Sequence, residues 1–155
     1  LYSQGVQLAK QGDSLRAEQY LSGALQAGHD PAETTRALVS VCVRGSRLRS
    51  AVTYASSHLS SRPSDNELRK LQATLLWSLG DAERAAHELR LVVALDADDA
   101  AAHYLLTLVL APSAEARPHA ERYLELEPDG DHAEEVKNLL DVELPQPGNL
   151  PGRAS

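Results

Sequence analysis

The chain has 155 residues, enough for one ordinary domain with a real core, so a multidomain enzyme with separate cofactor and substrate lobes is not expected. Apolar residues make up 43% and charged residues 24%, which excludes disorder over most of the chain. The formal net charge of −7 argues against nucleic acid or an anionic membrane as the main partner, because phosphate binding needs a basic surface. No apolar run in the sequence approaches the roughly 18 residues of a membrane span, so no direct membrane insertion is expected.

Apolar residues recur at helical spacing, and turn-forming residues interrupt them at regular intervals. This pattern predicts helices at about 2–11, 14–27, 32–44, 47–60, 66–79, 82–95, 100–111 and 114–126, with a last helix near 131–141. Helix-start signals agree with these bounds. Asp30 followed by Pro31 predicts an N-cap with a first-turn proline, and Ser64 to Glu67 has the pattern of a capping box.

The sequence also repeats itself with a period of 34 residues. The step links three sets of residues: Ala17, Ala51 and Ala85; Gly12, Ser46 and Gly80; and Leu8, Cys42, Leu76 and Leu110. The alanines would let two helices approach closely, and the Gly or Ser interrupts the helical pattern near the middle of each unit. Each unit is therefore predicted to be two antiparallel helices joined by a tight turn.

This arrangement resembles the tetratricopeptide repeat (TPR) family, whose pattern includes a small residue at the eighth place, Ala at the twentieth and Pro at the thirty-second. The second unit, counted from residue 32, has Val39, Ala51 and Pro63 at those places, and it departs from the pattern at His58, where the family prefers a small buried residue. The resemblance covers roughly four-fifths of the chain. It implies an all-α fold, a right-handed α-α superhelix (solenoid) of about four helical hairpins with a C-terminal capping helix.

We therefore expect one TPR-like helical-repeat domain over residues 1–141 and a Pro/Gly-rich extended tail over residues 142–155. The expected units are about 1–31, 32–65, 66–99 and 100–128, followed by the capping helix at 131–141. The fourth unit is irregular, because Pro112 and Pro118 crowd its turn.

The resemblance also implies where a partner would bind. In the family, the first helix of each hairpin lines a concave groove that holds an extended or helical peptide. Carried over place by place, the expected groove residues are Tyr2, Val6, Arg36, Ser40, Val43, Lys70, Thr74, Trp77, Tyr104 and Leu108. Aromatic and cationic side chains in this set favour a protein or peptide partner that is acidic and carries apolar anchors.

The same residues allow a purely structural interpretation, in which Trp77 covers a neighbouring helix. The two cations would then pair within their own helices, Arg36 with Glu33 and Lys70 with Glu67. The carboxylate clamp of chaperone-binding family members is not matched here, because Tyr2 and Val6 occupy its first places. Recognition of a chaperone C-terminus is therefore not expected.

No catalytic residue, metal site or cofactor is predicted. The six histidines are scattered about one per helix; His103 and His119 could meet across the fourth hairpin, but no third ligand accompanies them. Cys42 shares its repeat place with leucines, which predicts a buried thiol. Asp96, Asp98 and Asp99 are expected to cap helix ends, and the sequence has neither a nucleophile elbow nor a glycine-rich phosphate loop.

These features predict a non-catalytic protein–protein interaction module, a scaffold or adaptor that holds a peptide segment or partner helix in its groove. The alternative is a structural subunit of a larger assembly, such as a bacterial envelope, secretion or pilus complex, that makes contact through its convex face or its Pro-rich tail. The acidic run from Glu125 to Glu135 and the arginines of the second unit could also orient two copies head to tail. The compartment stays open: cytoplasmic, or periplasmic if an upstream signal or lipid anchor was removed.

Overall fold

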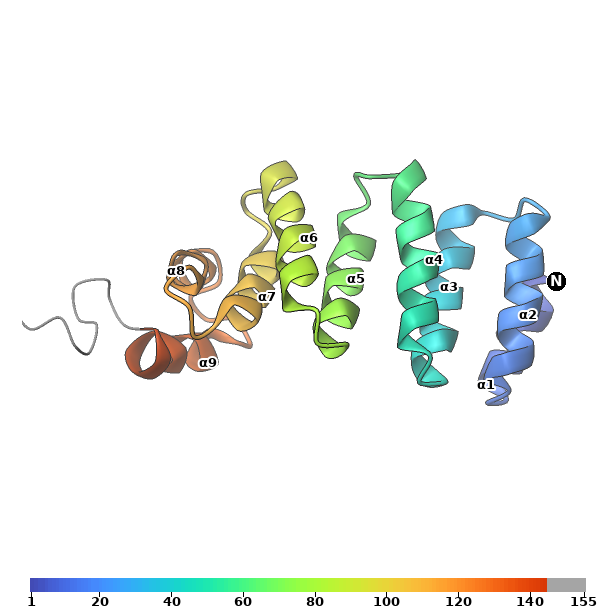
Figure 1. The fold of residues 1–155 in the computed structure, drawn as a ribbon, viewed down its shortest axis with the longest axis horizontal. Helices are drawn as coiled ribbons and strands as arrows, with labels where there is room; N and C mark the ends of the chain where they lie inside the picture. Colours follow the sequence, from blue (N-terminus) through green and yellow to red (C-terminus); the bar gives the residue numbers. More distant parts are fainter. Residues whose placement is uncertain (145–155) are drawn as a thin grey trace, which may run out of the picture. The chain divides into compact units, whose positions relative to one another are not determined.

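Helices follow one another along the chain with short turns between them (Figure 1). The structure is a computed structural model, and it describes residues 1–144. Its elements are α1 (Tyr2–Lys10), α2 (Ser14–Gln26), α3 (Pro31–Arg44), α4 (Leu48–Ser61), α5 (Asn66–Ser78), α6 (Ala82–Leu95), α7 (Ala100–Leu110), α8 (Ala116–Leu126), α9 (Ala133–Asn138) and the π-helix η1 (Leu139–Glu143). No strand occurs within residues 1–144, and α1 to α8 begin and end within about two residues of the predicted bounds. The predicted all-α class is therefore confirmed.

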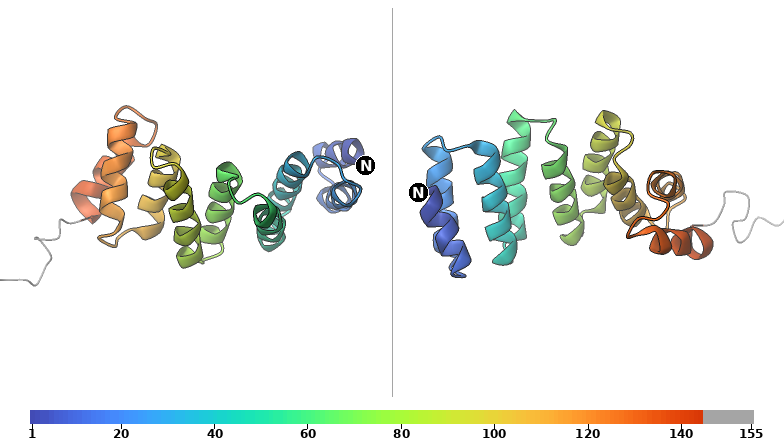
Figure 2. Two further views of the ribbon diagram at one scale, coloured as in Figure 1. Left: turned by 90° about the horizontal axis from the view of Figure 1, so that it is seen from above. Right: turned by 180° about the vertical axis from the view of Figure 1, so that it is seen from behind.

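The chain forms two compact units, and the boundary between them follows Leu79. Unit 1 holds α1 to α5: α1 packs on α2, α2 on α3, α3 on α4 and α4 on α5 (Figure 2). Unit 2 begins at Gly80 and holds α6 to η1, with α6 packed on α7, α7 on α8 and α8 on α9. The structure thus places α5 and α6, which were predicted to form the third hairpin, in different units.

The predicted turn positions are confirmed by their backbone conformation. Gly12 and Gly80 have φ of +86°, and Ser46, one period after Gly12, has φ of +58°. The left-handed conformation of Gly12 ends α1. It turns the chain so that the following amide, Asp13 N–H, donates back to the Leu8 carbonyl of α1 at 3.0 Å. The 34-residue period therefore repeats a specific helix stop.

Aspartates begin five of the described helices. Asp13, Asp30, Asp65, Asp81 and Asp99 each accept a hydrogen bond from the backbone N–H three residues ahead. The capping box predicted from Ser64 to Glu67 is wrong, because Asp65 is the N-cap of α5 and takes the Leu68 N–H at 3.1 Å. Its carboxylate is fixed there by contacts from two other helices, α3 and α4.

Each unit has its own apolar core. In unit 1 it centres on Ala17, Leu21, Leu38 and Val41. In unit 2 it includes Ala116, Ala120, Tyr123, Val136 and Leu144. The repeat alanines Ala17, Ala51 and Ala85 are fully buried, as expected where helices touch.

The packed structure continues past residue 141, where the extended tail was predicted to begin. Val142 and Glu143 belong to η1, and Leu144 is fully buried with its carbonyl accepting from Arg117 Nη1 at 2.6 Å. The rest of the predicted tail, residues 145–155, lies outside the described residues. Among the helices of residues 1–144, none has the length and apolar character that a membrane crossing requires.

Candidate partner-binding site

Eight of the ten predicted groove residues lie in unit 1, on α1, α3 and α5. On α1, Tyr2 and Val6 are half-buried and pack against the unit 1 core. The Tyr2 ring also stacks on His29, with ring centroids 4.2 Å apart. Helix α1 therefore uses this face largely for packing.

On α3 and α5 the predicted face is more open. Arg36, Ser40 and Val43 are exposed on α3, whereas Leu38 and Cys42 on the same helix are fully buried. On α5, Thr74 is half-buried, and its hydroxyl donates to the Lys70 carbonyl at 3.0 Å. Val43 and Trp77 occupy one repeat place, and both are 38% exposed. The two helices thus present large apolar side chains to solvent at equivalent positions.

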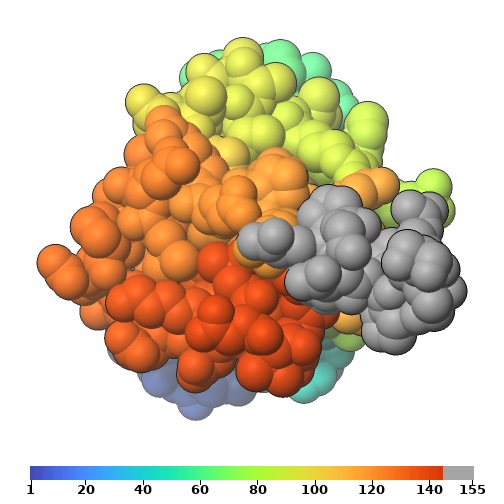
Figure 3. Space-filling view, turned by 90° about the vertical axis from the view of Figure 1, so that its left-hand side faces the viewer, coloured from blue at the N-terminus to red at the C-terminus, as the bar shows by residue number. Residues whose placement is uncertain are grey.

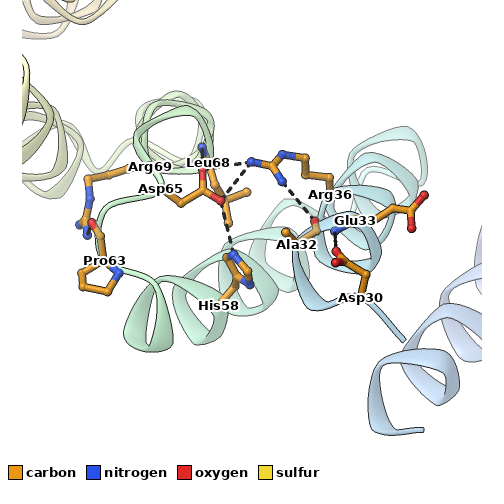
Figure 4. A network of polar contacts seen from close by, with 9 residues as sticks. All are labelled: Asp30, Ala32, Glu33, Arg36, His58, Pro63, Asp65, Leu68 and Arg69. Carbon is orange, nitrogen blue, oxygen red and sulfur yellow. Dashed lines mark hydrogen bonds and ion pairs between the residues drawn. The ribbon is translucent and has the colours of Figure 1, made fainter. Parts of the chain in front are cut away.

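Arg36 is engaged within the fold through Asp65 (Figure 4). Its Nη2 atom donates to both carboxylate oxygens of Asp65, at 3.1 and 3.0 Å. The imidazole of His58 on α4 is buried, and its Nε2 atom lies 3.4 Å from Asp65 Oδ2. Asp65 therefore joins α3, α4 and the start of α5, and Arg36 is one of its three partners.

Lys70 is also paired within the fold. Its Nζ atom lies 2.8 Å from Glu67 Oε1, and the lysine side chain is only 12% exposed. The structural interpretation was therefore right for Lys70. For Arg36 it named the wrong partner, because Glu33 instead contacts His29 Nε2 at 3.1 Å.

The remaining two predicted groove residues, Tyr104 and Leu108, lie on α7 in unit 2. Tyr104 borders a cavity of about 520 Å³, which we call the aromatic cavity. Its lining comes from α7, α8 and the loop before α9: Ala100, Ala101, Tyr104, Leu105, Tyr123, Glu127, Gly130, Asp131 and His132. Figure 3 shows the neighbouring surfaces of α8, in orange, and of α9 with η1, in red. Leu108 is half-buried and does not line this cavity.

Three rings of the aromatic cavity contact one another. Tyr104 stacks on His132 with centroids 3.9 Å apart, and it meets Tyr123 at 5.6 Å in a tilted arrangement. The Tyr104 hydroxyl donates to Glu135 Oε2 at 2.9 Å, and burial together with Glu135 raises the pKa of Tyr104 to about 12. The Tyr123 hydroxyl accepts from the His132 backbone N–H at 3.3 Å. Hydrogen bonds therefore hold both tyrosine rings in place.

Known structures share this helical arrangement. A TPR protein from Parabacteroides merdae superposes with a TM-score of 0.78 at 18% identity, covering 90% of this chain and 57% of its own. YrrB, described as a TPR protein with an unusual peptide-binding site, gives 0.72 at 22% identity, covering 89% of this chain and 73% of its own. The chain has the tetratricopeptide repeat fold. The first TPR domain of Spaghetti (RPAP3), bound to the HSP90 peptide SRMEEVD, gives 0.60 at 20% identity, covering 71% of this chain and 95% of its own. No protein-family model matches the sequence, and no curated protein matches it significantly.

A second hollow lies in unit 1, at residues that sequence analysis did not place in the groove. It is a cavity of about 630 Å³ lined mainly by α4, through Tyr54, Ser57, His58 and Ser61, and by Arg62, which follows the helix. Tyr54 also borders a neighbouring hollow of about 470 Å³ on α2. The Tyr54 hydroxyl donates to Glu18 Oε1 at 3.0 Å, and burial with this contact raises the pKa of Tyr54. The second helices of unit 1 therefore also offer a concave surface.

The side chains considered for chemistry serve packing and hydrogen bonding in the TPR fold. His103 and His119 meet across α7 and α8, as predicted, with their Nδ1 atoms 3.0 Å apart. Within residues 1–144 no group of three or more His, Cys, Asp or Glu side chains is placed to hold a metal ion. Cys42 is fully buried, as predicted, and burial raises the pKa of its thiol to about 11. Such a thiol stays protonated at neutral pH and is a poor nucleophile.

Proposed function

We propose that the chain is a non-catalytic protein–protein interaction module that binds a peptide segment or partner helix on the exposed faces of its first helices. The observation that carries this proposal is the pair of exposed apolar side chains at one repeat place, Val43 and Trp77. An accessible tryptophan that a partner can desolvate is typical of binding hot spots. The fold supports the proposal, because the RPAP3 domain with this fold is bound to a peptide.

For unit 1 we propose an acidic partner segment with an apolar anchor. Residues 1–79 carry nine Lys and Arg against six Asp and Glu, a formal charge of +3. Arg36 keeps 48% of its side chain exposed while it holds Asp65, so part of its guanidinium can face a partner carboxylate. Lys70 would contribute less, because its side chain is largely covered and paired.

Trp77 provides the test, because it is the single tryptophan of the sequence. Peptides would be selected from a random library against the full chain and then titrated while Trp77 emission is recorded. We expect a blue shift on binding, since a docked peptide removes the indole from water. Trp77→Ala should weaken binding about tenfold or more, the effect of losing a hot-spot aromatic.

A matched control is Leu15→Ala, which shortens another exposed apolar side chain of unit 1, on the second helix α2. It should leave the affinity of selected peptides within about twofold, because surface residues outside the contact contribute little. Arg36→Glu is not a clean probe, because it would also break the Asp65 network. Peptides that bind without changing Trp77 emission and tolerate Trp77→Ala would contradict the proposed site.

The cavity on α4 favours one alternative, a structural subunit that contacts its assembly through its second helices. The exposed Ser57 lines this cavity, so Ser57→Arg would fill it without touching the core. If Ser57→Arg abolishes the binding of selected peptides and Trp77→Ala does not, the second-helix face is the binding surface. The Pro-rich tail, named in the same alternative, lies outside the described residues.

A further inference from the structure

The aromatic cavity of unit 2 combines aromatic faces with carboxylates, a chemistry unlike that of the unit 1 faces. Tyr104, Tyr123 and His132 supply rings, and Glu127 and Asp131 supply negative charge at the same cavity. Aromatic faces attract cations through their quadrupole, and desolvation strengthens this attraction. The lining therefore suits a cationic group with a flat or apolar body.

The two carboxylates of the cavity have no cation of their own. Neither Glu127 nor Asp131 forms an ion pair with another residue of the described chain. The nearby cations are taken elsewhere: Arg122 pairs with Glu125 and Asp98, and Lys137 lies 3.4 Å from Glu134. The negative charge at the cavity is thus available to a ligand.

The net charge of unit 2 also favours a cationic ligand. Residues 80–144 carry five Lys and Arg against sixteen Asp and Glu, a formal charge of −11. Such an excess concentrates cations near a concave surface and speeds their association. An acidic peptide, in contrast, would be repelled from this unit.

The walls of the cavity are fixed before any ligand arrives. Tyr104 is held by Glu135 and by stacking on His132, and Tyr123 is held by the backbone of the loop before α9. Gly130 lets this loop approach, because a Cβ there would lie 2.7 Å from the Tyr123 hydroxyl oxygen. A site whose rings are already ordered loses little entropy on binding.

We propose that the aromatic cavity binds the guanidinium group of an arginine side chain from a partner protein. A guanidinium is planar, so it can stack on a tyrosine or imidazole ring while its N–H groups reach Glu127 and Asp131. A lysine ammonium has the charge without the plane and should bind more weakly. This inference rests on the proposed function, since it assigns one side chain of the bound partner.

The test uses the full, isotope-labelled chain and three small probes followed by NMR: N-acetyl-arginine amide, N-acetyl-lysine amide and N-acetyl-citrulline amide. Citrulline has the shape of arginine without its charge. We expect arginine to shift the amide signals of Tyr104, Tyr123, Gly130 and His132, lysine to bind more weakly, and citrulline to bind at least about tenfold more weakly than arginine. Equal shifts with arginine and citrulline, or shifts elsewhere only, would overturn the proposal.

Variants separate the cavity from the general negative field. Glu127→Gln with Asp131→Asn should weaken arginine binding about fivefold or more, the loss of two charge-assisted contacts at an open site. The matched control, Asp141→Asn with Glu143→Gln, removes the same charge from exposed positions of η1 and should change binding less than about twofold. Equal losses from the two double variants would mean that the field alone attracts the probe and would overturn the site.

The outcome is independent of the test of the proposed function. If library peptides bind through Trp77 but arginine shows no advantage over citrulline, this inference fails and the interaction module stands. If arginine binds in the cavity but no library peptide binds through Trp77, the arginine site stands and the proposed peptide site on unit 1 fails.

Discussion

The two units share one pattern of helices but differ in charge and in how that charge is used. Residues 1–79 have a formal charge of +3, whereas residues 80–144 have −11. In unit 1, the groove cations are paired inside the fold, Arg36 with Asp65 and Lys70 with Glu67. In unit 2, Glu127 and Asp131 have no ion-pair partner within the described residues.

The difference shows that the type of a charged residue does not reveal whether it stabilises the fold or binds a partner. Arg36 has the residue type of a partner-binding cation, yet it also joins two hairpins through the N-cap of α5. The carboxylates of Glu127 and Asp131 form no ion pair that joins helices of the described residues. The charges of unit 1 should therefore matter first for stability, and those of the unit 2 cavity first for binding.

The largest expected effect on stability comes from removing the centre of the unit 1 network. Asp65→Ala should lower the free energy of unfolding by about 3 kcal/mol, because it removes a helix cap and leaves Arg36 without its carboxylate. The measurement is urea unfolding followed by far-UV circular dichroism.

Asp81→Ala is the matched variant in unit 2. Asp81 caps α6 in the same way, but within the described residues its ion pair is a long one, 3.9 Å, to the exposed Arg84. We expect a loss of about 1 kcal/mol, the value of a cap alone. Equal losses for the two variants would mean that the Arg36 and His58 contacts add nothing to stability.

The second expected effect concerns the eighth place of the repeat, where α1 and α7 differ. Gly5 in unit 1 has Leu21 against it: an added Cβ would lie 2.7 Å from Leu21 Cγ. Gly5→Val should therefore cost about 2 kcal/mol through overpacking. Thermal unfolding measures it, and a variant as stable as the wild type would show that α1 and α2 can move apart freely.

Thr107 holds the same repeat place in α7, where there is room for a β-branched side chain. It is fully buried, and its hydroxyl donates to the His103 carbonyl at 2.8 Å. Thr107→Ala should cost about 1 kcal/mol, because the hydrogen bond from the Thr107 hydroxyl to the His103 carbonyl is lost. The two variants thus compare overpacking at a close helix contact with the loss of one buried hydrogen bond.

Much of the fold could be predicted from the sequence, because the period of 34 residues repeats the same stop and start signals. Gly12, Ser46 and Gly80 mark left-handed turns, and aspartates precede the next helices. These signals act within a few residues of the chain. The capping box failed by one residue: Asp65, and not Ser64, is the N-cap of α5, as aspartates are for four other described helices.

The site was less predictable, because its contacts join residues that lie far apart in the sequence. The repeat register placed Trp77 on an open face, but it could not reveal which cations are already paired. It also missed most of the aromatic cavity, because Gly130 and His132 lie in the loop that leads to α9 and Tyr123 lies on α8, the second helix of the irregular fourth unit. Of the three rings, only Tyr104 was among the predicted groove residues.

A smaller effect is the pH dependence of unit 2. His103 Nε2 faces the Ala97 carbonyl at 2.8 Å and must donate to it, so in the neutral pair His119 Nδ1–H donates to His103 Nδ1. Burial, His103 and Arg90 from α6 lower the pKa of His119, and Glu115 opposes them. The unfolded chain therefore takes up the proton first as the pH falls through about 6.5, the ordinary histidine value.

Stability should thus be complete above about pH 6.5 and decline below it until folded His119 is protonated as well. Urea unfolding at a series of pH values measures the slope, and His119→Gln should reduce it. An unchanged slope in the variant would assign the pH dependence to other groups.

The smallest effect tests the turn that both units share. Ser46 has the left-handed φ of +58° that Gly12 and Gly80 adopt without a side chain. Ser46→Gly relieves about 1 kcal/mol of backbone strain but adds roughly half of that in unfolded-chain entropy, so a net gain of about 0.5 kcal/mol is expected. Gly80→Ser, the reverse change at the first residue of unit 2, should lose a similar amount in urea unfolding. If instead Ser46→Gly is destabilising, the serine makes a contribution that its backbone conformation does not explain, and the equivalence of the two turns fails.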